Sequence, residues 1–329
     1  MPNNKPTFDV IAVGDATLDT FLKLQDVIVI PSREEHNAMV CLPYADKILV
    51  ETFDQQVAGN AANNAIGSAR LGLKSAFYSI VGNDDSGKKV IAAMKREGVS
   101  IKYLRIDRKH PTNYTVVLNY DGERTQCIYR LDRAYKLPKL SKANWVYYTA
   151  VGKNHVTLEK EIIDYVNLHG AKLAFNPGDY QLKRGAKALG GVLEKTSVLF
   201  VNKEEGYKLV GMHDLPDLLK KLRELGPKII VVTDGSKGAY AYDGNQSYHM
   251  RVFPVKLVEM TGAGDSFATG FMAALYHGEE IYEALRWGTS NSASVISFVG
   301  PQKGLLTRQG MKTMLVRFKK ITPKKIWVG

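Results

Sequence analysis

Short apolar runs rich in β-branched and aromatic residues alternate with longer amphipathic stretches along much of the chain. The run at 8–14, FDVIAVG, predicts a buried strand that ends at a glycine. Repeated strand–helix alternation is typical of right-handed βαβ units around a parallel sheet. We therefore expect a doubly wound, mostly parallel α/β fold, with mostly helical structure over 264–318. The other expected elements are a helix at 59–72, a strand at 75–81, a helix at 84–98, strands at WVYYT, AKLAFN, SVLFVN and KIIVVT from residue 145 on, and helices near 155–169, 180–194 and 203–225.

Two segments interrupt this alternation. The first, 20–57, is irregular and contains two short apolar runs, VIVI and KILVETF. The second, 103–137, contains two β-rich runs joined by an Asp-Gly turn, which predicts a hairpin, and GAYAYDGNQSYHMRV predicts another. Ligands of open α/β sheets bind beyond the carboxyl ends of the strands. We therefore predict a single α/β domain over 1–329, with a small β-rich lid formed by about 20–57 and 103–137.

The composition is that of an ordinary globular chain. It has 329 residues, 45% hydrophobic and 24% charged, which is enough for a large core. The sequence contains no run of about 18 apolar residues, so we expect no membrane span. No basic segment precedes an apolar one at the N-terminus, which argues against a signal peptide. Cys41 and Cys127 have no metal-ligand spacing. So few cysteines favour a cytoplasmic location, and a single disulfide between them stays open.

The formal net charge is +12, and its distribution decides what it implies. Most Lys and Arg are scattered next to acidic residues, as in KKVIAAMKREG, and only RFKKITPKKIW forms a cluster. Dedicated nucleic-acid binding is therefore not expected. A basic surface also attracts anionic small molecules such as nucleoside triphosphates, which fits the same charge.

The stretch EMTGAGDSFATGF, 259–271, carries the clearest chemistry. Gly262, Ala263 and Gly264 let the backbone approach a ligand closely. The first amides of the helix that follows have no internal partner and favour an anion. Asp265 places a carboxylate beside this cradle. In phosphoryl transfer, the amides stabilise the moving phosphoryl group while a carboxylate accepts the proton of the attacking hydroxyl. The structural alternative is that Asp265 only caps the helix.

EMTGAGDSF resembles the C-terminal signature of the ribokinase-like (PfkB) carbohydrate kinases, D-T-x-G-A-G-D-x-F. Further stretches match that family in the expected order over nearly the whole chain. VGDATLDTF resembles its first strand end, which implies that Asp19 binds substrate hydroxyls. AGNAANNA resembles its G-G-x-x-x-N signature, which implies that Gly59 and Asn63 lie against the sugar. A lid built from two segments is also a trait of the family.

The resemblance extends to the nucleotide side. VNKEE matches the N-x-x-E motif, which implies that Asn202 and Glu205 organise Mg²⁺, largely through water. Such an ion keeps several waters and needs only one or two carboxylates. TDGSKG matches the family's nucleotide loop, which implies ATP contacts from Thr233, Gly235 and Gly238. Taken without the resemblance, N-x-x-E is more commonly a capped helix start.

Three departures from the family pattern concern the pocket and a cation. Ala58 stands for the first glycine of the N-terminal signature. Glu259 and Met260 stand for the Asp-Thr pair that opens the C-terminal signature. The resemblance implies a monovalent cation near the anion site, held in part by residue 259. Because Glu is one methylene longer than Asp, and because SFVGPQKG (297–304) lacks the usual arginine-glycine form, activation by K⁺ stays open.

We therefore predict an ATP- and Mg²⁺-dependent kinase that phosphorylates a primary hydroxyl of a sugar, with ribose or fructose first. Asp265 is the predicted general base, and the amides of 262–264 form the anion hole. A nucleoside kinase is the alternative, since nucleoside members share these motifs. A catalytically weak ribokinase-fold binding or regulatory protein is the second alternative. Exposed strand edges in the lid also favour a homodimer through the lid.

Overall fold

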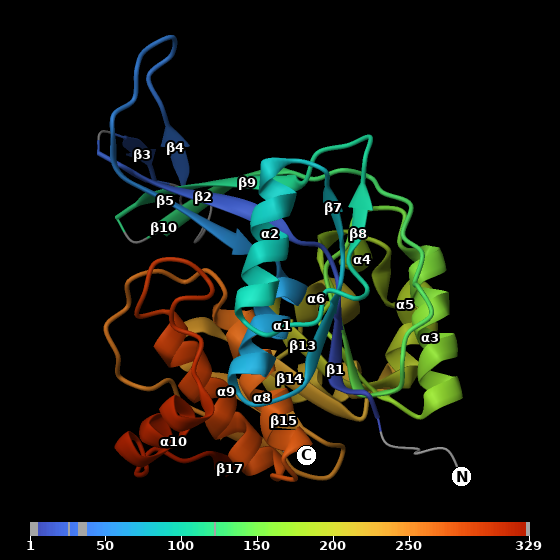
Figure 1. The fold of residues 1–329 in the computed structure, drawn as a ribbon. Coiled ribbons are helices and arrows are strands. Elements are labelled where there is room, and N and C mark those ends of the chain that lie inside the picture. Colours follow the sequence, from blue (N-terminus) through green and yellow to red (C-terminus); the bar gives the residue numbers. More distant parts are fainter. Residues whose placement is uncertain (1–5, 26, 32–37, 122, 327–329) are drawn as a thin grey trace.

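A large, mostly parallel sheet forms the centre of the molecule (Figure 1). The computed structural model describes residues 6–25, 27–31, 38–121 and 123–326. Strands β6, β1, β11, β12, β13 and β14 are parallel, and β15, β16 and β17 continue the sheet antiparallel. In sheet order, the strands are β17 (Lys324–Ile326), β16 (Ser247–Met250), β15 (Ala239–Tyr242), β14 (Ile229–Thr233), β13 (Thr196–Asn202), β12 (Lys172–Phe175), β11 (Ala143–Tyr148), β1 (Phe8–Val13) and β6 (Ser75–Tyr78).

Helices cover both faces of the large sheet, which makes two hydrophobic cores. Successive side chains of a strand point to opposite faces. Val10 and Ala12 of β1 therefore enter one core, and Ile11 and Val13 enter the other. One face carries α1 (Asn60–Arg70), α2 (Asp85–Arg96), α8 (Ala263–Tyr276), α9 (Ile281–Val295) and α10 (Arg308–Arg317); the other carries α3 (Val156–His169), α4 (Asp179–Leu182), α5 (Gly185–Lys195), α6 (Lys203–Val210) and α7 (Leu215–Glu224).

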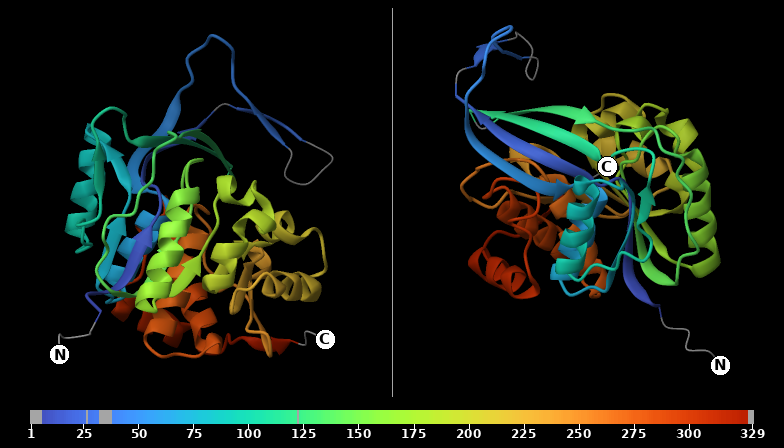
Figure 2. Two further views of the ribbon diagram at one scale, coloured as in Figure 1. Left: turned by 90° about the vertical axis from the view of Figure 1, so that its right-hand side faces the viewer. Right: turned by 45° about the horizontal axis from the view of Figure 1, so that its top comes forward.

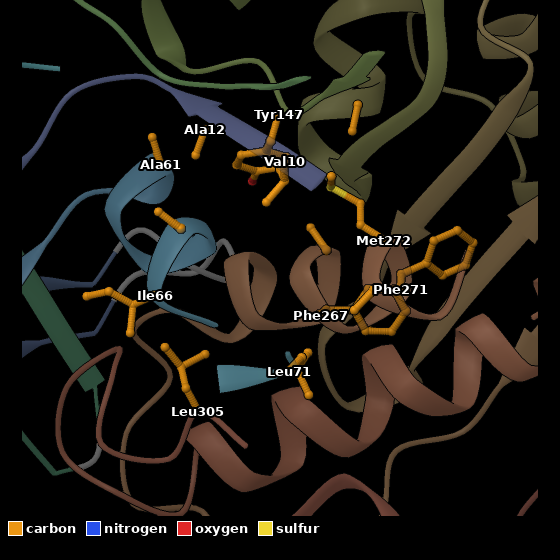
Figure 3. Close-up of a cluster of buried hydrophobic side chains, with 14 of the residues drawn as sticks. Val10, Ala12, Ala61, Ile66, Leu71, Tyr147, Phe267, Phe271, Met272 and Leu305 are labelled. Carbon is orange, nitrogen blue, oxygen red and sulfur yellow. The ribbon is translucent and has the colours of Figure 1, made fainter. Parts of the chain in front are cut away.

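The core beneath α8 fixes the helix that carries the glycine-rich turn. Figure 3 shows Phe267, Phe271 and Met272 of this helix among side chains from α1 and from the large sheet, including Tyr147. Phe271 is fully buried and packs edge-on against Phe200 of β13. The start of α8 is thereby held against the carboxyl ends of the strands.

A second, four-stranded sheet lies above the carboxyl ends of the large sheet (Figure 2). β2 pairs parallel with β9, and the two outer pairs are antiparallel. Two short strands extend from it as an arm, β3 (Ile28–Ile30) and β4 (Met39–Cys41). In order, the strands of this small sheet are β10 (Glu123–Tyr129), β9 (Asn113–Tyr120), β2 (Thr17–Leu24) and β5 (Val50–Ala58).

The structure confirms the predicted α/β class and the small sheet drawn from two segments, and it corrects several boundaries. The small sheet begins at Thr17 and not near residue 20. Its strand TLDTFLKL was not predicted, because polar residues interrupt its apolar pattern. The helix expected over 180–194 is divided into α4, which ends at Leu182, and α5, which begins at Gly185 with φ 74°. Gly211, with φ 87°, likewise divides the helix expected over 203–225. The strand expected over 75–81 is divided into β6 and β7 (Ile80–Gly82), and β7 pairs with β8 (Arg105–Asp107).

Two expectations about the surroundings of the protein can be compared with this fold. Over the described part of the chain, no helix combines the length and the apolar character that crossing a bilayer requires. Cys41 and Cys127 are both free thiols, so the disulfide left open above is not formed.

Candidate active site

A cavity of about 370 Å³ is lined by residues at the carboxyl ends of the large sheet and by residues of the small sheet. This main cavity is the place expected for a ligand of an open α/β sheet. The structure brings most of the predicted site residues to its wall. These are Asp19, Gly59, Asn63, Asn202, Glu205, Thr233, Gly262, Ala263, Gly264 and Asp265.

The glycine-rich turn begins α8 with a left-handed residue. Gly262 has φ 80° and ψ 3° and is the N-cap of the helix. A Cβ on it would lie 2.5 Å from the Cβ of Pro301, so only glycine fits. The amide of Ala263 donates to the carbonyl of Met260 at 3.2 Å and closes the turn. One of the three amides predicted for the anion hole is therefore used within the protein itself.

Asp265 points across the main cavity toward α1. Its Oδ2 accepts a hydrogen bond from Asn63 Nδ2 at 2.9 Å, and Gln302 donates to the Oδ1 of the same asparagine at 3.0 Å. Because Gly262 is the N-cap, Asp265 does not cap the helix. Burial raises the pKa of Asp265 to about 6, while the hydrogen bond from Asn63 and the charge of Arg124 act to lower it. A carboxylate with this pKa can accept a proton near neutral pH.

Asp19 lies at the other end of the main cavity, on β2. The hydroxyl of Thr17 donates to its Oδ1 at 2.5 Å. Burial raises the pKa of Asp19 to about 6; hydrogen bonds from Thr17 and Thr115 lower it, and the charge of Glu259 adds to the increase. The carboxylate faces a pocket of mixed polar groups, which suits the hydroxyls of a small polar ligand.

Gly59 connects the small sheet to α1 and allows a close backbone approach. It has φ 102°, and a Cβ there would lie 2.4 Å from the carbonyl oxygen of Asp15. The preceding Ala58, which departs from the family pattern, is buried and also lines the main cavity. Its methyl group therefore occupies space at the wall of the main cavity.

Asn202 and Glu205 form a reciprocal capping box at the start of α6. The Asn202 side chain accepts from the Glu205 amide, and the Glu205 carboxylate accepts from the Asn202 amide, both at 2.8 Å. The commoner explanation for N-x-x-E is thus present, yet both residues also line the main cavity. Burial raises the pKa of Glu205 to about 7, and the nearby carboxylates of Asp179 and Asp265 add to the increase. A cation would relieve this repulsion.

Three predicted residues lie outside the main cavity wall. Gly235 starts a single 3₁₀ turn, Gly235–Lys237, and Gly238 follows it with φ 96°. This loop borders a second hollow of about 560 Å³ that includes Ser236, Lys237 and Tyr240. Glu259 is buried behind the glycine turn, with 4% of its surface exposed. Among the described residues, no group of three or more His, Cys, Asp or Glu side chains forms a ready metal cage.

Strand β10 contributes side chains that sequence reasoning missed. Arg124, Gln126, Ile128 and Arg130 all line the main cavity. They follow one another at every second position, so they lie on one face of the strand. That period-two pattern is visible in ERTQCIYR, and it could have indicated from the sequence that these side chains share one face.

A buried network supports one of these arginines. Arg130 Nε lies 4.0 Å from Asp15 Oδ2, and the Tyr135 hydroxyl is 2.9 and 3.0 Å from the two Asp15 oxygens, to which it donates. Burial raises the pKa of Asp15 to about 6, and the charge of Arg130 opposes this increase. The network holds a guanidinium at the acceptor end of the main cavity.

Comparison with solved structures agrees with this architecture. The ribokinase of Arabidopsis thaliana, solved in complex with ribose and ATP, superimposes with a TM-score of 0.76 at 21% identity. The match covers 94% of this chain and 98% of the other. At this identity the likeness concerns the fold, which is the ribokinase fold.

Sequence relatives are sugar kinases. An ATP-dependent 6-phosphofructokinase of Thermoanaerobacterium thermosaccharolyticum is 24% identical, over 89% of both chains. A 5-dehydro-2-deoxygluconokinase of Geobacillus thermodenitrificans is 27% identical, over 75% of this chain and 80% of its own. The model of the pfkB family carbohydrate kinases matches residues 28–308. The chain therefore belongs to the pfkB family of carbohydrate kinases.

Proposed function

We propose that this kinase transfers the γ-phosphoryl group of ATP to a primary hydroxyl of a sugar, with Asp265 as the general base. One observation carries the proposal: a buried carboxylate stands at the start of α8, between the acceptor side of the main cavity and the glycine turn. Because burial raises the pKa of Asp265 to about 6, the group is ionised at neutral pH and still basic enough to take a proton.

The acceptor and the phosphoryl group would meet at this carboxylate from opposite sides. Asp19, Gly59 and Asn63 would orient the sugar, and the hydrogen bond from Asn63 holds the Asp265 carboxylate in place. The turn at 262–264 would stabilise the transferring phosphoryl with its backbone. Since the Ala263 amide is engaged with Met260, the amides of Gly262 and Gly264 would do most of this.

Mg²⁺ and ATP would occupy the nucleotide side. Glu205 and Asn202 would hold the ion largely through water, which suits an ion that keeps most of its hydration shell. When bound, the ion would neutralise charge on the phosphates. Thr233 lines the main cavity, and the Gly235–Gly238 loop at the end of β14 would support the nucleotide beside it.

The small sheet would act as the lid over the main cavity. Its strands supply Thr17, Asp19, Thr115 and the β10 side chains to the cavity wall, so a shift of this sheet changes the acceptor site. A closed lid excludes water, which limits the hydrolysis of ATP. ATP, Mg²⁺ and free thiols agree with the cytoplasmic location expected from the sequence.

A sugar fits the acceptor end better than a nucleoside. Apart from Ile128, the side chains that β2, β9 and β10 place on the described cavity wall are polar or charged, with no aromatic ring on which a base could stack. The two sequence relatives described above are also named as kinases of sugar-type acceptors. Ribose and fructose are the first acceptors to test, and a nucleoside kinase remains the alternative.

The exposed arm supports a homodimer. Large apolar side chains of the arm and of the adjoining segment 49–53 are open to solvent, with 69% of Ile28, 72% of Leu49 and 66% of Phe53 exposed. Exposed apolar side chains that gather in a patch mark interaction sites. We propose that a second copy of the chain covers it. A monomeric mass by sedimentation velocity at micromolar concentration would contradict this.

The deciding experiment measures ADP release from ATP and Mg²⁺ over a panel of ribose, fructose, other hexoses, phosphosugars and nucleosides. Turnover with one acceptor class, lost in Asp265→Asn, is the expected result. If no acceptor gives ADP release and the protein binds no nucleotide, the kinase hypothesis is refuted and the alternative of a weakly catalytic binding protein is favoured.

A further inference from the structure

The carboxylate of Glu259 is surrounded by donors of the protein itself. Its Oε1 accepts from the amide of Thr261 at 2.7 Å and from the hydroxyl of the same threonine. Its Oε2 accepts from the amide of Gly300 at 3.0 Å. Arg124 Nη1 lies 3.4 Å from Oε1. Each carboxylate oxygen has about two lone-pair sites, so the three donors at Oε1 fill that oxygen and one lone pair of Oε2 is left.

These residues do not fit the monovalent cation that the family resemblance implies. A metal ion at Glu259 would have to displace a donor from Oε1, or bind through the single remaining lone pair of Oε2. It would also stand beside the guanidinium of Arg124, and two like charges at contact distance repel strongly where water is scarce. Glu259 has only 5% of its side chain exposed, so solvent would screen this repulsion poorly.

The positive charge at this carboxylate comes from the small sheet. Arg124 lies on β10 and Glu259 precedes the glycine turn, so the ion pair joins two parts that are distant in sequence. On the opposite edge of the small sheet, β5 makes two further contacts with the same C-terminal region. Gln56 donates to the carbonyl of Val299 at 3.0 Å, and Lys303 pairs with Asp54 at 2.5 Å. Both edges of the small sheet are thus fastened beside the turn.

We propose that Arg124 serves as a built-in cation at Glu259, in place of a monovalent metal ion. The carboxylate that organises the glycine turn is then neutralised only when the small sheet is seated over the main cavity. Closure of the acceptor side would thereby complete the phosphoryl side, and turnover would not require K⁺. Arg124 is a positioning residue in this proposal. The kinetic part rests on the proposed kinase function, whereas the structural part does not.

The first test compares salts. ADP release and the thermal unfolding midpoint are measured in KCl, NaCl and choline chloride at one ionic strength. We expect both quantities to agree across the three salts, with rates within about twofold of one another. Activation by K⁺ of tenfold or more, or a midpoint raised by K⁺ alone, would overturn the proposal. If no acceptor is turned over, the thermal unfolding midpoint in the three salts still tests whether K⁺ binds.

The second test is a double-mutant cycle with Arg124→Gln, Glu259→Gln and the double variant. Hydrogen bonds to charged groups are worth about 1.5–3 kcal/mol, so we expect Arg124→Gln to lower kcat on the order of tenfold. The double variant should be no worse than Glu259→Gln alone, both in kcat and in the unfolding midpoint. Additive losses would show that the two side chains act independently and would overturn the proposal.

Controls separate this role from a general loss of structure. Lys23→Gln removes an exposed ion pair of the small sheet, Lys23–Glu51, whose two atoms are 2.8 Å apart. It should change neither quantity. Arg124→Lys keeps the charge and should recover most of the kcat. If Glu259→Gln does not fold, the salt comparison is repeated with Arg124→Gln, which should then gain activity from K⁺ or guanidinium ions. No gain would count against the proposal.

Discussion

The two sheets contribute to one cavity but differ in how firmly they are held. Strand β1 of the large sheet has five of its six residues buried, with helices on both faces. Every residue of β10, at the edge of the small sheet, is exposed to solvent. The phosphoryl side is therefore built on a packed core and the acceptor side on a thin sheet. A site made this way can keep its chemistry fixed while its acceptor half moves or changes.

This difference predicts how substitutions should divide between kcat and KM. Residues anchored to the large sheet and α8 should affect the chemical step. Residues of the small sheet should affect acceptor binding, except Arg124, which contacts Glu259 beside the glycine turn. Each variant below tests one side of that division.

The largest effect is expected for Asp265→Asn. The asparagine keeps the size of the side chain but cannot accept the proton. Because a general base contributes about 10² to 10⁴ in rate, kcat for ADP release should fall by that factor. ATP affinity, measured by calorimetry, should stay within about twofold. Full activity in this variant would place the base elsewhere.

A smaller loss of a different kind is expected for Asp19→Asn. Its carboxylate lies on β2 and faces the acceptor end of the main cavity. A hydrogen bond to a charged group is worth about 1.5–3 kcal/mol, so the acceptor KM should rise by about tenfold to 100-fold, with kcat changed much less. A fall in kcat at unchanged KM would erase the contrast between the two sheets.

The pH dependence of activity should reflect the titration of three carboxylates together. The pKa values of Asp265 and Asp19 are raised to about 6 and that of Glu205 to about 7, all through burial. Activity that needs these groups ionised should therefore fall below about pH 7, and by at least tenfold at pH 5. An acidic limb centred near pH 4 would show that burial does not act on these groups.

Stability should respond in the opposite direction. The folded pKa of Asp265, about 6, lies above the value of 3.8 for an unperturbed Asp. The folded state therefore binds more protons between about pH 4 and 6, and the free energy of unfolding falls as the pH rises through this range. One such group costs about 3 kcal/mol at neutral pH. Asp265→Asn should gain in unfolding midpoint relative to the wild type on going from pH 4.5 to 7.5.

The smallest effect on activity is expected for Leu49→Lys, just before β5 and next to the exposed arm. The side chain is 72% exposed and does not line the main cavity. Kinetic constants should stay within about twofold, while sedimentation velocity should show a shift from dimer to monomer. An unchanged dimer would mean that another surface joins the copies.

Sequence reasoning succeeded where the signal is local. The alternation of strands and helices, the glycine turn and Asp265 each occupy a few consecutive residues, and all are found where they were expected. Strand β2 was missed because Thr17, Asp19 and Lys23 interrupt its apolar residues. The contribution of Arg124 depends on pairing between remote segments, which no short motif records.

The parallel pairing of β2 with β9 has a consequence for how the protein folds. Thr17 is opposite Asn113, so the long segment between them must close into a loop before this pair can form. Contacts of such long sequence separation form slowly, because the entropy of loop closure is lost before the contacts compensate for it. The large sheet contains a parallel pairing of still longer separation, since Phe8 of β1 is opposite Ala143 of β11. Both halves of the site therefore depend on long-range pairing, and we expect this pairing, rather than local helix formation, to limit the folding rate.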